Sequence, residues 1–217
     1  MLIIGNGTVY TGGKDKRLIE TGAVAIDGTK IIKVDFCKNL KAKYPDAQFL
    51  DANGMFIMPG FINTHEHIYS AFARGLSMQG EPAKDFLGIL KSIWWKMDKH
   101  LTLEQTYYSA ISTYIESIKN GVTFVSDHHA SYFHIQGSLG EIEKAARKLG
   151  VRTCLCYEVS DRDGNEKRDE ALAENVSFLN KVAQRKDSMI SGLFGLHASF
   201  TLSNDTLRLC REVNKGG

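Results

Sequence analysis

The sequence is poor in cysteine and proline and contains no long hydrophobic or basic run. Its 217 residues include four cysteines and three prolines. No apolar stretch approaches the roughly 18 residues of a transmembrane helix, and no basic segment precedes an apolar one at the N-terminus. We therefore predict neither a membrane span nor a signal peptide. The cysteines form no CxxC pair, which favours reduced thiols in a cytoplasmic protein over a disulfide framework.

Positively and negatively charged residues are nearly equal in number, so the formal net charge is +2. No basic cluster alternates with aromatic residues, which argues against nucleic acid or a membrane surface as the main partner. Hydrophobic residues make up 43% and charged residues 24%, proportions that are ordinary for a globular protein. The length allows one or two domains with a substantial core.

The first 54 residues read as short strands separated by turns. Asp27-Gly28 lies between two apolar runs and is typical of a tight hairpin. A second turn is expected at residues 5–7, and a short helix at 39–44. The segment holds too little apolar material for a self-sufficient domain. We predict that residues 1–54 form part of a small β-sandwich domain.

From residue 55 onward, apolar runs alternate with helical patterns. Helix starts are indicated by two capping boxes, Thr102 with Gln105 and Ser138 with Glu141. Strands that are apolar throughout are typical of a parallel sheet covered by helices. The expected strands are 56–63, 122–126, 151–159 and 190–196. The fold class is therefore predicted as α/β, with residues 55–217 forming about four βα units, the first half of a (β/α)₈ TIM-type barrel.

The strongest chemical signal is the pair His65 and His67 at the end of the first barrel-type strand. Residues two apart on a strand project to the same side, so both imidazoles can reach one ion. Neutral imidazole suits zinc and iron(II), and the carboxyl ends of barrel strands are where active sites lie. The alternative is two surface histidines near a turn. An HExxH zinc motif is excluded because position 69 is Tyr69.

Three segments resemble the amidohydrolase superfamily, in its cytosine deaminase/triazine hydrolase (chlorohydrolase) branch and most closely the SsnA-type aminohydrolases. Met58–His67 is similar to the proline-glycine segment that ends in the family's HxH motif, and Asn120–His129 is similar to its second strand. Gly195–Ser203 is similar to the motif after strand four, with Leu196 and Ser199 where the family often has proline. The resemblance extends along the chain but covers only the N-terminal portion of such proteins.

The resemblance implies a metal-dependent hydrolase that cleaves C–N, non-peptide, bonds of a small cyclic amidine or related heterocycle and releases ammonia or chloride. His65 and His67 would be ligands of one divalent metal ion, Zn²⁺ or Fe²⁺, which activates water. His197 would contact the substrate, and His128 is a further candidate for substrate binding. A two-metal site of the dihydropyrimidinase kind is disfavoured because residues 194–197 contain no lysine.

Two questions stay open at this point. Asp127, His128 and His129 either line the pocket or are hydrogen-bonded rim residues. The family's third histidine ligand, its HxxE glutamate and its late aspartate do not occur in these 217 residues, so no acid-base catalyst is assigned. We therefore expect the chain alone to be inactive. The rival interpretation is an incomplete half-barrel that functions only with a partner chain, and a homo-oligomer is also left open.

Overall fold

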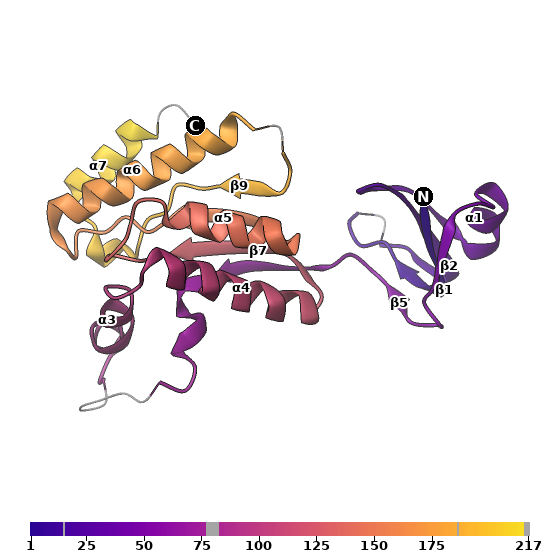
Figure 1. The fold of residues 1–217 in the computed structure, drawn as a ribbon, viewed down its shortest axis with the longest axis horizontal. Coiled ribbons are helices and arrows are strands. Elements are labelled where there is room, and N and C mark those ends of the chain that lie inside the picture. The colour runs from indigo at the N-terminus through magenta and orange to yellow at the C-terminus, as the bar shows by residue number, and fades with distance from the viewer. Residues whose placement is uncertain (15, 77–82, 186, 215–217) are drawn as a thin grey trace. The chain divides into compact units, whose positions relative to one another are not determined.

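The computed structural model describes residues 1–14, 16–76, 83–185 and 187–214. They form two compact units, Met1–Gly60 and Phe61–Gly217 (Figure 1). Among the helices in these ranges, none combines the length and the apolar composition needed to cross a bilayer.

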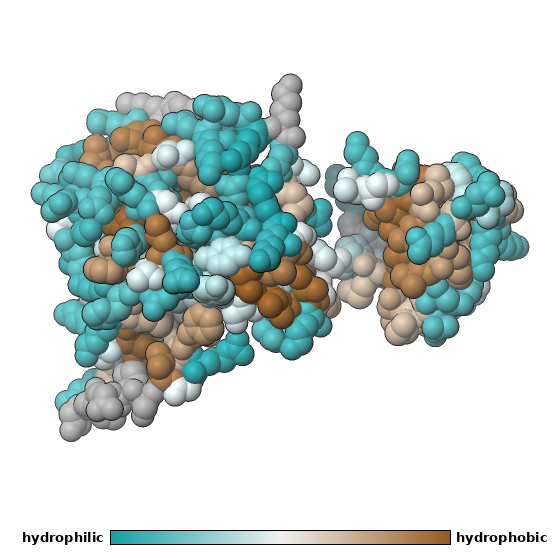
Figure 2. Space-filling model, in the orientation of Figure 1, coloured by the Kyte–Doolittle hydropathy of each residue, from teal (hydrophilic) through white to brown (hydrophobic). Residues whose placement is uncertain are grey.

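The first unit is a five-stranded sheet with one helix. Its elements are β1 (Leu2–Tyr10), β2 (Leu18–Asp27), β3 (Lys30–Phe36), α1 (Cys37–Lys43), β4 (Gln48–Asp51) and β5 (Phe56–Ile57). The strand order is β3-β2-β1-β4, and β5 also pairs with β1. Ile3, Ala23, Ala25 and Leu40 form the small core. Figure 2 shows further hydrophobic residues on the surface of this unit, and the large apolar side chains that are more than half exposed include Leu18, Ile31 and Phe56.

The turn expected at residues 5–7 is instead an irregularity within one long strand. β1 pairs in parallel with β4 through residues 2–5 and with β5 through residues 8–9. Asn6, at φ 60°, lies between the two stretches and donates its amide to Asp51. A side chain at Gly7 would collide with the carbonyl of Met55, so glycine allows the close approach.

The pairing of β5 also explains where the two units divide. The boundary expected after Gly54 placed residues 56–63 in the first barrel strand. Phe56 and Ile57 instead pair with β1, and the barrel strand starts at Phe61. The division between the compact units accordingly falls after Gly60.

The second unit alternates strands and helices. Its elements are β6 (Phe61–Glu66), η1 (Ile68–Ala73), α2 (Phe86–Ile89), η2 (Leu90–Trp94), α3 (Trp95–Met97), α4 (Leu103–Lys119), β7 (Val122–His129), α5 (Ser138–Leu149), β8 (Arg152–Tyr157), α6 (Gly164–Ala183), β9 (Ile190–Gly192), η3 (Ser199–Thr201) and α7 (Asn204–Val213). The sheet has the order β6-β7-β8-β9, and every pairing is parallel. These observations confirm the predicted four βα units.

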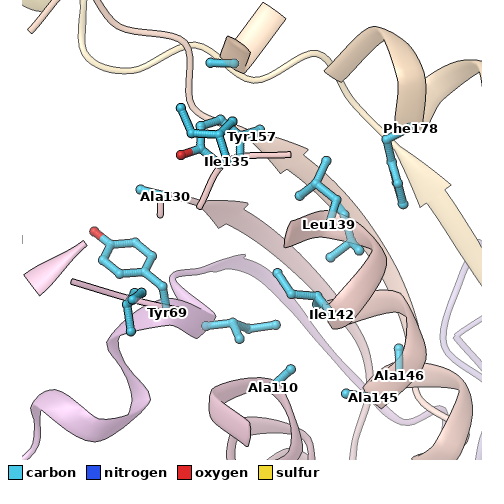
Figure 3. Packing of buried hydrophobic residues seen from close by; sticks show 14 of the residues in the cluster. Tyr69, Ala110, Ala130, Ile135, Leu139, Ile142, Ala145, Ala146, Tyr157 and Phe178 are labelled. Carbon is cyan, nitrogen blue, oxygen red and sulfur yellow. The ribbon is translucent and has the colours of Figure 1, made fainter. Parts of the chain in front are cut away.

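The main core lies between this sheet and its helices. Ala110 of α4 and Leu139 and Ile142 of α5 pack with Leu155 and Tyr157 of β8, and all five are buried (Figure 3). Burial of such side chains contributes roughly 1.5–3 kcal/mol each for the larger ones. The helices therefore fix the strands whose carboxyl ends carry the polar residues.

The capping box at Thr102 is confirmed, since its hydroxyl accepts from the Gln105 amide and the Gln105 side chain accepts in return. The box predicted at Ser138 is wrong. The Ser138 hydroxyl donates to the Ile135 carbonyl, and the amides of residues 137 and 139 donate to the carboxylate of Glu174. A carboxylate from α6 thus replaces the local cap at the N-terminus of α5.

Asn175, buried on α6, joins the ends of two strands. Its side-chain oxygen accepts from the amides of Tyr157, at 3.0 Å, and Gly195, at 3.3 Å. Its amide donates to the Tyr157 carbonyl at 2.8 Å. One side chain therefore satisfies backbone groups at the end of β8 and in the segment after β9.

Replacing Asn175 with alanine is expected to lower the free energy of unfolding by about 3 kcal/mol, because buried backbone groups lose partners worth about 1–3 kcal/mol each. Urea denaturation followed by circular dichroism measures this. Asn180→Ala, exposed on the same helix, is the control and should change stability by less than about 0.5 kcal/mol. If Asn175→Ala and Asn180→Ala lowered the free energy of unfolding equally, the stabilising role given to Asn175 would be contradicted.

His129 is a second buried polar residue, on the helix-facing side of β7. Val125, Asp127 and His129 alternate on this side and are buried. The His129 Nε2 lies 3.0 Å from the Ser131 hydroxyl oxygen, which itself donates to the His134 carbonyl. Nε2 must therefore carry the proton. Burial is the main cause that lowers the pKa of His129 to about 3.

A histidine buried in its neutral form makes the fold sensitive to acid. Below about pH 6.5 the unfolded chain binds a proton at position 129, whereas the folded chain does not until about pH 3. The unfolded state thus holds more protons in this window, and stability falls as the pH falls. The stability difference between wild type and His129→Gln should shrink by about 1.4 kcal/mol per pH unit from pH 6 to pH 4.

Urea denaturation at each pH checks this expectation. His134→Gln, at an exposed position, is the matched control, and its difference from wild type should stay constant. The buried carboxyl groups occur in all three proteins, so their contribution to the pH dependence of stability cancels when the proteins are compared. If the stability difference between wild type and His129→Gln did not change with pH, the pKa of His129 would be the same in the folded and unfolded states.

Candidate metal centre

The HxH segment is held by side chains of its own strand. The Glu66 carboxylate accepts from the Asn63 side-chain amide at 2.7 Å and from the backbone amide of His67 at 3.0 Å. The Asn63 side-chain oxygen accepts from the backbone amide of His65 at 3.3 Å. Asp127, on the neighbouring strand, accepts from the amide of Ile68 at 2.7 Å. These contacts fix the backbone on both sides of the two histidines.

The two rings face a common space. The Nε2 atoms of His65 and His67 are 3.1 Å apart, and the rings meet edge to face. The Nδ1 of His67 lies 2.8 Å from the His128 carbonyl oxygen, which can only accept. Nδ1 therefore carries the proton, and the lone pair of His67 is on Nε2. Burial is the main cause that lowers the pKa of His67, which favours the neutral ring.

This geometry fits a divalent metal ion. Two nitrogens bound to one zinc ion at about 2.0–2.1 Å in a tetrahedral arrangement lie about 3.3 Å apart, close to the observed separation. The carbonyl partner of His67 is the kind of second contact that orients metal-binding histidines. Within the described ranges, no group of three histidine, cysteine or acidic side chains is arranged to hold a metal. This chain therefore offers two imidazole ligands.

A cavity of about 570 Å³ opens beside the histidine pair. Its polar lining includes His65, His67, Ser70, His128, Glu158 and His197, and the aromatic and apolar side chains around them include Tyr69, Phe86, Leu90 and Trp94. All four residues predicted from the sequence are thus brought together. Asp127 and His129 are not in the lining, so of the three residues left open only His128 faces the cavity.

His128 and His197 are both held by a hydrogen bond from one ring nitrogen. His128 Nε2 donates to the Leu196 carbonyl at 3.0 Å. His197 Nδ1 lies 2.8 Å from the Thr201 hydroxyl oxygen, whose proton goes to the Ala198 carbonyl. The opposite nitrogens, Nδ1 of His128 and Nε2 of His197, therefore carry lone pairs in the neutral rings. Burial is the main cause that lowers the pKa of both, for His197 to about 4.

Glu158, which sequence reasoning missed, is the acidic residue of the cavity. It follows β8 directly and is buried, with one oxygen 3.0 Å from Arg162. Arg162 is also buried and pairs with Asp98 at 2.5 Å. The ring of Tyr132 stacks beneath the guanidinium at 3.9 Å. A charged residue at the end of an otherwise apolar strand was the available signal in the sequence.

Burial acts strongly on these carboxyl groups. It raises the pKa of Glu158 to about 8 and that of Asp98 to about 6, against the opposing effect of Arg162. Glu158 and Asp98 share the single guanidinium of Arg162, whose one positive charge cannot balance two negative charges. This end of the cavity therefore favours a proton or another hydrogen-bond donor.

Comparison with known proteins adds to this geometry. A model described as the amidohydrolase family matches residues 56–215. The chain is 32% identical over 201 residues to a 5'-deoxyadenosine deaminase of Methanobrevibacter smithii, covering 88% of this chain and 43% of that protein. It is also 32% identical over 211 residues to a 5-methylthioadenosine/S-adenosylhomocysteine deaminase of Thermococcus sibiricus, covering 97% of this chain and 46% of that protein.

Among solved structures, an atrazine chlorohydrolase from Arthrobacter aurescens TC1 complexed with zinc superposes with a TM-score of 0.74 at 19% identity. The match covers 98% of this chain and 50% of that one, which confirms the predicted half of a TIM-type barrel. The chain spans about half the length of the curated relatives that it matches. Since the family model extends over more than half of its residues, the chain belongs to the amidohydrolase family.

Proposed function

We propose that this chain contributes the first metal ligands and part of the substrate pocket to a hydrolase that deaminates a small cyclic amidine. The observation that carries the proposal is the convergence of the His65 and His67 Nε2 atoms at the edge of a cavity that also contains His197. His65 and His67 would hold a divalent ion there, Zn²⁺ or Fe²⁺, and when bound such an ion would lower the pKa of water toward neutrality. The rest of the ligand set and the acid-base catalyst are expected beyond these 217 residues.

The residues of this chain have separate tasks in the proposal. His65 and His67 present lone pairs to the metal ion, and the His128 carbonyl holds His67 in the required tautomer. His197 Nε2 accepts a hydrogen bond from the substrate ring. Leu90 and Trp94 supply apolar walls that cover the faces of a flat heterocycle and exclude water.

Ammonia is the leaving group that we favour. Both relatives described above are named as deaminases of adenosine derivatives, and the six-membered ring of adenine is a cyclic amidine. The structural neighbour is named as a chlorohydrolase, so release of chloride is the second candidate. A panel of amino- and chloro-substituted purines, pyrimidines and triazines distinguishes the two by the product released.

Substitution of His67 by alanine in the full-length protein is expected to reduce bound zinc or iron well below one ion per chain and to abolish turnover, because one of few ligands is lost. His197→Ala should keep the metal and reduce turnover by about 100-fold or more, as loss of a positioned contact does. Elemental analysis and steady-state kinetics provide the two measurements.

His100→Ala, at an exposed position outside the cavity, is the matched control and should retain both metal and turnover. Loss of metal from His197→Ala would mean that this residue is a ligand. Full metal content in His67→Ala would remove the basis of the proposed metal centre.

The 217-residue chain by itself is expected to show no turnover on the same panel when Zn²⁺ or Fe²⁺ is supplied. Two imidazoles form a weak metal site, and positioned proton transfer, which typically contributes 10²–10⁴-fold, has no assigned residue here. The outer strands of the sheet, β6 and β9, also leave backbone groups unpaired among the described residues. Comparison with the full-length protein at equal molarity tests this, and metal-dependent turnover by a monomer of this chain would refute it.

A further inference from the structure

The feature that the proposed function leaves unused is the free oxygen of Glu158. One oxygen of this carboxyl group accepts from Arg162. The other, Oε2, has no hydrogen-bond donor within reach among the described residues, although the side chain is only 4% exposed and lines the cavity. Because this oxygen faces the cavity and accepts no hydrogen bond from the protein, a ligand in the cavity can supply the donor.

The neighbours of this oxygen are acceptors as well. His128 Nδ1 lies 3.8 Å from Oε2 and His197 Nε2 lies 3.9 Å from it, both too far for a direct hydrogen bond. Because the opposite nitrogen of each ring already donates its proton elsewhere, both of these nitrogens carry lone pairs. Among the described residues, none of these three acceptor atoms receives a hydrogen bond from the protein, although the Tyr69 hydroxyl lines the same cavity.

Charge favours the same kind of ligand. Among the residues that the structure describes, Arg162 is the arginine or lysine that contacts Glu158, and it is shared with Asp98. Asp163, near Arg162, is paired with Lys99 and adds no net charge. Ionisation of both carboxyl groups would give the cluster of Glu158, Arg162 and Asp98 a net charge of −1, and the raised pKa values of the two acids reflect the cost of that charge, which a donor from a ligand lowers.

We propose that Glu158 is a specificity-determining residue that accepts hydrogen bonds from an N–H-rich edge of the substrate, of the amidine or guanidine type. This inference rests on the proposed function, because it assumes that the cavity receives the substrate ring. The reacting carbon of the ring faces the His65 and His67 pair, and the donor-bearing edge faces Glu158.

Two triazines probe the proposal by calorimetry with the full-length, zinc-loaded protein. Melamine presents amino groups on its edge, whereas 2,4,6-trimethoxy-1,3,5-triazine has a similar ring and no N–H. The wild-type protein is expected to bind melamine at least about tenfold more tightly, as one charge-assisted hydrogen bond would give. Equal affinity, or a preference for the methoxy ring, would overturn the inference without any variant.

Glu158→Gln should abolish the preference. A glutamine oxygen can still accept from Arg162, while its amide group donates to the lone pairs of His128 and His197 and offers no acceptor to the ligand. Affinity for melamine should fall about tenfold or more, and affinity for the methoxy ring should not fall. Zinc content and melting temperature, measured on the same sample, show that the metal centre and the fold persist.

Asp98→Asn is the matched control, because it removes a carboxylate from the same arginine without altering the cavity lining. It should change the ratio of the two affinities by less than about threefold. If Asp98→Asn and Glu158→Gln weaken both triazines equally, Glu158 serves only to hold Arg162, and the inference fails.

The proposed function is judged separately. A wild-type protein that holds no zinc, or that turns over no compound of the amino and chloro panel, would contradict the hydrolase assignment. The ratio of the melamine and trimethoxytriazine affinities, measured in that case on the protein without added zinc, would still decide the role of Glu158.

Discussion

The arrangement of the cavity depends on one hydrogen bond between neighbouring strands, from His67 Nδ1 to the carbonyl of His128. It fixes which nitrogen of His67 is free and turns that nitrogen toward His65. The same residue, His128, donates its own Nε2 to the Leu196 carbonyl beyond β9. Each of these two rings is thus oriented by a backbone carbonyl from a neighbouring segment, β7 for His67 and the segment after β9 for His128. The orientation of the imidazoles therefore depends on the parallel pairing of the strands and on the segment that follows β9.

The histidines of the cavity could be predicted from the sequence, whereas its acidic residues could not. The positions of His65 and His67 two residues apart on one strand, and of His197 after another, follow from local periodicity and from the common edge of a parallel sheet. The helices from Leu103 and Ser138 were likewise foreseen from spacing. Local patterns fail where a distant group intervenes, as Glu174 does when it caps α5 in place of the predicted box.

The acidic end of the cavity illustrates the same limit. Asp98 and Arg162 are 64 residues apart in the chain, and nothing in either local sequence indicates that they meet. Glu158 lies next to the predicted strand end, but its partner becomes evident only from the fold. Similarly, the extra pairing of β5 with β1 is a long-range contact, and it moves the division between the units to Gly60. Sequence patterns thus predicted which elements exist, while long-range hydrogen bonds decided where they end and which side chains they bring together.

The two ends of the cavity also differ in the charge that they accept. The His65 and His67 end offers lone pairs to a cation, and the Glu158 end offers a buried carboxylate whose only counterion is shared. Between them the apolar walls lower the local dielectric, so each end acts more strongly on a ligand than it would in water. A flat ring with an electrophilic carbon at one side and N–H donors at the other matches both ends at once. In the proposed function, the two ends would therefore select together for heterocycles that carry both features.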